Sequence, residues 1–146
     1  MSKGNTFEND LLQLIFNNVD IADIGDAGGL QNSATAGSLY VALHTADPGE
    51  AGTAATNETA YTNYARVAVA RTVGGWTVSG NSATNAGQIT FPQCGASGAT
   101  ITHVSITTAS SGTSKILYSG ALNSSLAVAL NITPLFAASG LTVTED

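Results

Sequence analysis

Residues 38–44 read Ser-Leu-Tyr-Val-Ala-Leu-His, and large apolar side chains recur at every second position along this stretch. Leu39, Val41 and Leu43 fall on one side of an extended chain, which is typical of a strand with one face in a core. The Asp-Pro-Gly sequence at residues 47–49 is a strong turn signal. The stretch therefore predicts a strand that ends in a tight turn.

Seven further strand-like segments follow along the chain, separated by turns rich in Gly, Ser and Asn. Eight short strands suit a sandwich or a jelly roll. No second helical pattern interleaves with them, so a parallel sheet would lack its crossover helices. We therefore predict a mainly β protein, an antiparallel β-sandwich of the jelly-roll type with one N-terminal α-helix. The seven segments are residues 65–71, 76–79, 88–91, 101–107, 116–119, 126–130 and 141–144.

The predicted helix covers residues 5–19, where apolar side chains recur at helical spacing. Asn5 and Glu8 match a capping box at its start. A helix with such a wide apolar stripe needs cover on more than one side, which suggests an N-terminal docking arm. The candidate residues for docking to a partner are Phe7, Leu11, Leu14, Ile15 and Phe16.

A chain of 146 residues fits a single domain. We expect residues 1–36 to form the helix and a connecting arm, and residues 37–146 to form the sandwich. Residues 49–60 contain no periodic apolar set, so we expect a mobile surface loop there. The predicted core consists of Leu39, Val41, Leu43, Val67, Val69, Trp76, Ile89, Phe91, Val104 and Ile106.

The composition favours a protein that works inside an assembly. Only 10% of the residues are charged, and small residues such as Thr, Ser, Asn, Gly and Ala replace the missing charge. Such a surface is inexpensive to desolvate, so we expect homo-oligomers, either dimers or trimers. The four cations are scattered, which argues against nucleic-acid binding, and no apolar run is long enough for a membrane helix. The single Cys94 excludes an internal disulfide and fits synthesis in a reducing cytosol.

No set of residues in the sequence predicts an enzyme or a cofactor site. His44 and His103 lie in predicted strands without metal-ligand spacing, and Cys94 has no neighbouring base. Most acids lie in loops at residues 20–26 and 47–58, where carboxylates are poorly held for catalysis. We therefore predict no catalytic residue, no cofactor and no metal, with a weak divalent-ion site in the acidic loops as the open alternative.

Three aromatic residues leave a second alternative open. Trp76, Tyr61 and Tyr64 are of the kind that stacks on sugar rings, so they could form a carbohydrate platform. Packing in a core or an interface is the more common role for isolated aromatic residues. We expect packing, and the carbohydrate platform remains as the alternative.

Several stretches resemble a family of small proteins of tailed bacteriophages, whose members are often labelled tail-fibre proteins. The resemblance rests on residues 38–52, 57–67, 76–81, 89–92, 117–122 and 141–146, and it covers nearly everything from Gly37 onward. Within this group the chain resembles jelly-roll capsid cementing proteins, which sit on the outside of the head shell and bridge capsomers.

The resemblance implies a capsid decoration protein that is made in the host bacterial cytoplasm and is placed on the outer capsid surface of the virion. Its partner would then be the major capsid protein, and binding of many copies to the assembled shell would stabilise that shell. The alternative is a tail-fibre or receptor-binding module. That alternative predicts an exposed tip where Trp76 and the tyrosines meet a glycan.

Overall fold

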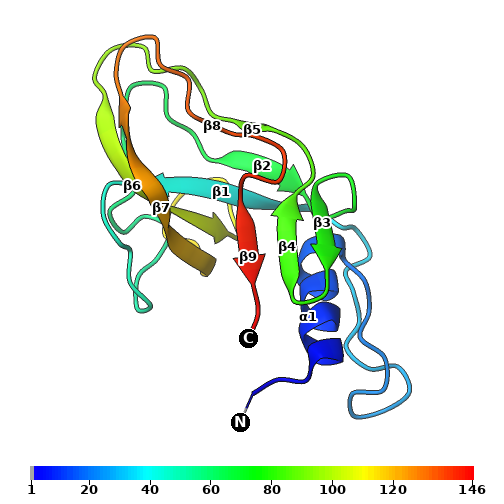
Figure 1. The fold of residues 1–146 in the computed structure, drawn as a ribbon. Coiled ribbons are helices and arrows are strands. Elements are labelled where there is room, and N and C mark those ends of the chain that lie inside the picture. Colours follow the sequence, from blue (N-terminus) through cyan, green and yellow to red (C-terminus); the bar gives the residue numbers. More distant parts are fainter. Residues whose placement is uncertain (1) are drawn as a thin grey trace. The chain divides into compact units, whose positions relative to one another are not determined.

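The computed structural model describes residues 2–146, which form one helix and nine strands (Figure 1). The helix comes first along the chain, and the strands follow in short succession. The elements are α1 (Asn5–Asn17), β1 (Ser38–His44), β2 (Val67–Ala70), β3 (Trp76–Ser79), β4 (Ser82–Asn85), β5 (Ile89–Thr90), β6 (Ala99–Thr107), β7 (Ile116–Val128), β8 (Leu135–Phe136) and β9 (Thr142–Thr144).

The strands form three sheets, with four, three and two strands. The strand orders are β2-β1-β6-β7, β3-β4-β9 and β5-β8. The registers of β1 with β6, β6 with β7, β3 with β4 and β4 with β9 are all antiparallel. The predicted mainly β class with antiparallel sheets and one N-terminal helix is therefore confirmed. The jelly-roll arrangement stays a prediction.

The chain divides into two compact units, each made from separate stretches of sequence. The first unit contains residues 1–38, 69–88 and 136–146, and so includes α1, β3, β4 and β9. The second unit contains residues 39–68 and 89–135, and so includes most of β1 together with β5, β6 and β7. The predicted division of the chain at residues 36 and 37 is not tested by these units and stays a prediction.

In the first unit α1 buries one stripe of its surface. Leu12 and Phe16 are fully buried, and the Phe16 ring lies 4.7 Å from the ring of Trp76 between centroids. The predicted capping box is wrong, because Gly4 is the N-cap residue and no side chain caps the helix. The helix also ends earlier than predicted, since Asn18 adopts a left-handed conformation with φ 58°.

The hairpin of β3 and β4 is the other main part of the first unit. Gly80 and Asn81 form its two-residue turn, because Ser79 pairs with Ser82, and Gly80 has a φ of 59°. Strand β4 was not predicted, since its sequence Ser-Ala-Thr-Asn lacks large apolar residues. Its last residue, Asn85, is fully buried and makes three hydrogen bonds to backbone groups through its side-chain amide.

In the second unit β1 and β6 lie in the middle of their sheet, and this position explains their burial. Four consecutive residues at the end of each strand are buried, which an alternating pattern does not predict. Strand β7 is a single strand of 13 residues, although the sequence predicted two strands in this region. The register shifts between Ile101 and His103 of β6, so residues 122–125 of β7 are inserted without direct partners.

Most of the predicted core is confirmed. Leu39, Val41, Leu43, Trp76, Ile89, Phe91, Val104 and Ile106 are all buried. The exceptions are Val67 and Val69, which are only half-buried because β2 lies at an edge of its sheet.

Candidate functional site

The most highly connected polar side chain in the second unit is Arg66, which lies immediately before β2. Its side chain is only 1% exposed. The Nε and Nη2 groups donate to the two carboxylate oxygens of Glu58, both over 2.7 Å. Nη1 donates to Ala109 O and Ser114 Oγ at 3.0 Å, and Nη2 also donates to Gly112 O at 2.7 Å. The guanidinium group thus has all its nitrogens paired inside the chain.

Tyr64 joins the same cluster through its hydroxyl group. The hydroxyl donates to Glu58 Oε1 at 2.9 Å and accepts the backbone N–H of Leu43 at 3.0 Å. Burial raises the pKa of the Tyr64 hydroxyl above its ordinary value, against the opposing effect of the Leu43 N–H donor. The hydrogen bonds that Arg66 donates to the Glu58 carboxylate raise the pKa of Arg66 in turn. Tyr64 therefore stays protonated and serves as a bridge between β1 and the ion pair.

The Arg66 cluster, defined here as Glu58, Tyr64 and Arg66, fixes two loops. Glu58 pairs with His44 in an isolated antiparallel bridge, which ties residues 49–60 to the end of β1. Arg66 holds the loop between β6 and β7 through its bonds to residues 109–114. The expected mobile surface loop at residues 49–60 is therefore anchored, and its Ala54 and Thr59 are buried.

His44 supports the same loop from the end of β1 and is fully buried. Its Nδ1 lies 2.9 Å from Thr56 O, and its Nε2 lies 2.8 Å from Ser105 Oγ. A carbonyl oxygen only accepts, so Nδ1 carries the proton and Nε2 accepts from Ser105 in the neutral ring. Burial lowers the pKa of His44 below its ordinary value, which keeps the ring neutral. His44 therefore acts as a structural connector.

A hollow of about 560 Å³ lies beside the Arg66 cluster. Its lining mixes apolar surface with hydroxyl and amide groups, and the guanidinium of Arg66 is already fully paired. Thr59 lines the hollow, and its buried Oγ1 has no hydrogen-bond partner within the chain. This oxygen is buried beneath the lining, so a molecule in the hollow does not reach it, and the missing hydrogen bond is a local cost of the fold. The lining comprises Glu58, Thr59, Ala60, Tyr61, Thr62, Asn63, Tyr64, Ala65, Arg66, Ser110, Ser111 and Gly112.

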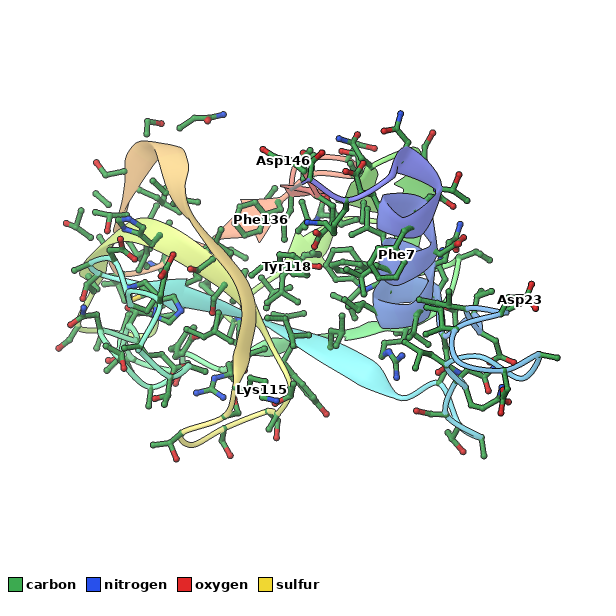
Figure 2. All side chains as sticks on the ribbon, turned by 90° about the horizontal axis from the view of Figure 1, so that it is seen from below. Phe7, Asp23, Lys115, Tyr118, Phe136 and Asp146 are labelled. Carbon is green, nitrogen blue, oxygen red and sulfur yellow. The ribbon has the colours of Figure 1, made fainter. Side chains whose placement is uncertain are left out.

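The five helix residues proposed for docking differ in exposure. Phe7 is 38% exposed and lies on the first turns of α1 (Figure 2). Leu11, Leu14 and Ile15 are half-buried. Phe16 is fully buried against Trp76, so it has no surface to offer a partner and is a core residue of its unit. The docking role of the other four stays a prediction.

The carbohydrate platform of Trp76, Tyr61 and Tyr64 is not present. Trp76 is fully buried in the first unit, while Tyr61 is buried in the second unit. The Tyr61 hydroxyl donates to Pro92 O at 2.8 Å, and burial raises its pKa to about 12. These aromatic residues pack in cores, as expected from the sequence, and an exposed aromatic tip built on Trp76 is therefore wrong.

The titratable residues do not gather into a metal-binding group. Within residues 2–146 no cluster of three or more His, Cys, Asp or Glu side chains could hold a metal ion. No helix in the same described range is long and apolar enough to cross a membrane. Glu58 and Arg66 were not predicted from the sequence as a pair. The sequence feature that could have indicated this ion pair is two opposite charges eight residues apart in a chain with few charges.

Comparison with protein families identifies the group to which the chain belongs. The family model described as podophage GP4 fiber I protein gp80 matches residues 2–144. The chain is a member of the fiber I family. The match runs from the residue before Lys3 to the last residue of β9, so it covers α1 and all three sheets. Among curated proteins no match was found.

Membership of the fiber I family confirms part of the resemblance inferred from the sequence. The chain belongs to a family of phage virion proteins, as expected. The family is a fibre family, so it agrees better with the tail-fibre alternative than with capsid cementing. The resemblance to jelly-roll decoration proteins is not confirmed.

Proposed function

We propose that this chain is a structural subunit of a tail fibre in a podophage virion. The observation that carries the proposal is the fiber I family match, which spans residues 2–144. The Arg66 cluster supports a structural role, because its charges are paired inside the chain and none is left to act on a substrate. A fibre subunit works by packing, so the proposal includes no catalytic residue and no cofactor.

The partners in this proposal are other copies of the chain, as dimers or trimers, and the virion protein that holds the fibre. The low charge supports this choice, since only 10% of the residues are charged and few long side chains must be desolvated on docking. Nucleic acid and membrane are not among the proposed partners.

Quantitative mass spectrometry of purified virions tests the proposed location. The copy number of this chain should be a small fraction of that of the major capsid protein, because a tail fibre is confined to the tail. Near-equal copy numbers would contradict the fibre proposal and would favour capsid cementing as the function. Absence from washed virions would contradict both.

A second candidate function is recognition of a saccharide by the fibre, and the hollow beside the Arg66 cluster supports it. Thr62, Ser110 and Ser111 bring hydroxyl groups to the less buried part of this lining. Ser111 lies at the exposed side of the hollow, so Ser111→Tyr should fill the hollow and abolish binding of the purified protein to host cells. Ser33→Tyr, at an exposed position in the other unit, is the control. Equal cell binding of both variants would contradict the saccharide site.

A further inference from the structure

Residues 18–33 form a loop that follows α1 and extends alongside it (Figure 1). This 18–33 loop exposes large apolar side chains: Val19 is 47% exposed, Ile24 39% and Leu30 44%. The described part of the chain has nine exposed large hydrophobic residues, and these three fall within twelve consecutive positions. Single exposed apolar residues are normal, whereas a group of them marks a surface for interaction.

The backbone of the 18–33 loop is held together at two levels. At its base, Asn18 Nδ2 donates to Ser33 O at 2.8 Å, and Asn18 Oδ1 accepts the N–H of Ser33 at 2.9 Å. Further along, Ile21 and Leu30 exchange two backbone hydrogen bonds of 3.0 and 2.8 Å. Ile21 is buried and so anchors the loop to its unit. Surface loops whose ends lie close together in this way are frequently functional.

Acidic side chains lie among the apolar ones. Asp20, Asp23 and Asp26 are all exposed, and no Lys or Arg occurs between Lys3 and Arg66. Figure 2 shows Asp23 on the side of the loop that faces away from α1. Asp20 and Asp26 accept backbone N–H groups, whereas Asp23 has no hydrogen bond or ion pair within residues 2–146. The fold therefore does not use the carboxylate of Asp23.

The charge of the whole first unit points the same way. This unit contains seven of the ten Asp and Glu residues but two of the four Lys and Arg residues, so it carries −5 of the net charge of −6. Both of its cations are engaged within the chain. Lys3 pairs with Glu145 at 3.0 Å, and Arg71 donates to Leu14 O and Ile15 O. The exposed carboxylates of the 18–33 loop are therefore left without a cation of their own unit.

We propose that the 18–33 loop docks onto a basic and partly apolar surface of another virion protein. The inference rests on the proposed structural role in the particle, and it adds the chemistry of the partner. Lys and Arg side chains of the partner complement the carboxylates of the loop. Their aliphatic stems and the apolar residues beside them cover Val19, Ile24 and Leu30.

The charges argue against the other classes of occupant. The first unit of a second copy would bring five more negative charges to the contact, and the second unit offers Lys115 as its one exposed cation among residues 2–146. Nucleic acid and an anionic membrane would be repelled by the same carboxylates. A divalent cation has no site, because within the described residues no three His, Cys, Asp or Glu side chains could hold one.

Synthetic peptides test this chemistry on the purified full-length protein. Three peptides of equal length alternate Lys with Leu, Lys with Ser, or Glu with Leu. An NMR titration that resolves each backbone N–H locates and measures binding. The Lys–Leu peptide should shift the signals of residues 18–33, and its binding should weaken as salt screens the charges. The Lys–Ser peptide should bind less tightly, and the Glu–Leu peptide should not bind.

Matched variants test whether the loop itself makes the contact. Asp23→Asn removes one charge, and asparagine is suited to the left-handed conformation at this position, where φ is 61°. It should weaken binding of the Lys–Leu peptide about twofold to fivefold, whereas Glu50→Gln, at an exposed carboxylate of the second unit, should not. Ile24→Ser should weaken binding at least about threefold. Its control is Val73→Ser, at a side chain of the same unit that is 77% exposed.

Three results of the titration would overturn the proposal. The Lys–Leu peptide could fail to bind, or it could shift signals outside residues 18–33 alone. The test variants and their controls could also weaken binding equally, which is the behaviour of a general attraction to an acidic protein. All three are obtained with purified protein, so they are separate from the result for location in the virion.

Carbodiimide cross-linking of purified virions tests the partner itself, because this reagent joins a carboxylate directly to a lysine amine in contact with it. Mass spectrometry should find peptides in which Asp20, Asp23 or Asp26 is joined to a lysine of a different virion protein. In virions that contain this chain, links only to Lys3 or Lys115 of a second copy would overturn the proposal. Absence of any link from this loop would overturn it as well.

Discussion

The Arg66 cluster and β7 belong to the same unit but differ in how deeply they are buried. Arg66 is fully enclosed, and each of its nitrogens donates to an oxygen of the same chain. Strand β7 is exposed along most of its length, and one of its edges faces no other described strand. The first region holds the fold together, whereas the second is an edge strand whose register against β6 shifts at two places.

This difference separates positions that hold the fold together from positions that do not. Changes at the Arg66 cluster should lower the free energy of unfolding, since they leave a buried charge without its partner. Changes at the exposed positions of β7 should leave the fold intact. The following predictions test this separation, and they run from the largest expected effect to the smallest.

Arg66→Ala should cause the largest loss of stability, about 3–5 kcal/mol, because Glu58 is then left partly buried without its ion pair. Urea denaturation followed by circular dichroism measures this loss. The double variant Arg66→Ala, Glu58→Ala removes the orphaned carboxylate, so it should recover part of the stability. A loss below about 1 kcal/mol, as for an exposed ion pair, would show that the cluster does not hold the loops.

Arg71→Ala should lower the free energy of unfolding by a smaller amount, about 1–3 kcal/mol. The side chain of this arginine donates to carbonyl groups in the first unit and has no carboxylate partner within residues 2–146. It donates to Leu14 O at 2.7 Å and to Ile15 O at 2.8 Å, which are acceptors near the C-terminal end of α1. A cation there is also favoured by the helix dipole. Arg71→Lys keeps the charge and should recover part of the loss in the same denaturation experiment. A loss as large as that of Arg66→Ala would remove the contrast between the two arginines.

His44 should make stability depend on pH in a known direction. Burial lowers its pKa in the folded state, so the unfolded chain binds protons more readily below the ordinary pKa of about 6.5. The free energy of unfolding should therefore fall as pH drops from 7 through roughly 6.5 towards the lowered pKa. His44→Gln should flatten this part of the profile in urea denaturation at several pH values. An unchanged slope in the variant would exclude His44 as the source.

Gly120→Ala should have the smallest effect on the isolated chain, within about 0.5 kcal/mol, because its Cβ atom meets nothing within 4 Å. Thermal denaturation at low protein concentration measures this effect without a contribution from dimers. Gly98→Ala is the contrasting variant, since its Cβ atom would clash with Val128 O. A loss for Gly120→Ala as large as that for Gly98→Ala would contradict open space at the Cβ position of Gly120.

The sequence predicted the strands wherever large apolar residues alternate. Strand β1 was predicted with the bounds that the structure has, because Leu39, Val41 and Leu43 mark one face clearly. Strand β4 was missed because its two buried residues, Ala83 and Asn85, are small or polar. The structure has the single strand β7 where the sequence predicted two strands, because apolar periodicity does not indicate an insertion within a strand.

The candidate site was harder to predict than the fold. The Arg66 cluster joins residues 58–66 to residues 109–114, and such contacts between distant segments have no local pattern in one sequence. The expectation of a mobile loop at residues 49–60 failed for the same reason, since polar contacts rather than apolar residues anchor it. The docking prediction for α1 included Phe16, although only the fold shows that this side chain faces Trp76.

Immunogold electron microscopy of intact virions tests the central claim, a fibre subunit of a phage particle, most directly. Antibodies raised against this chain should label the tail end of each particle, as the proposed tail-fibre role requires. Even labelling over the head shell would contradict the fibre role and would place the protein among capsid decoration proteins.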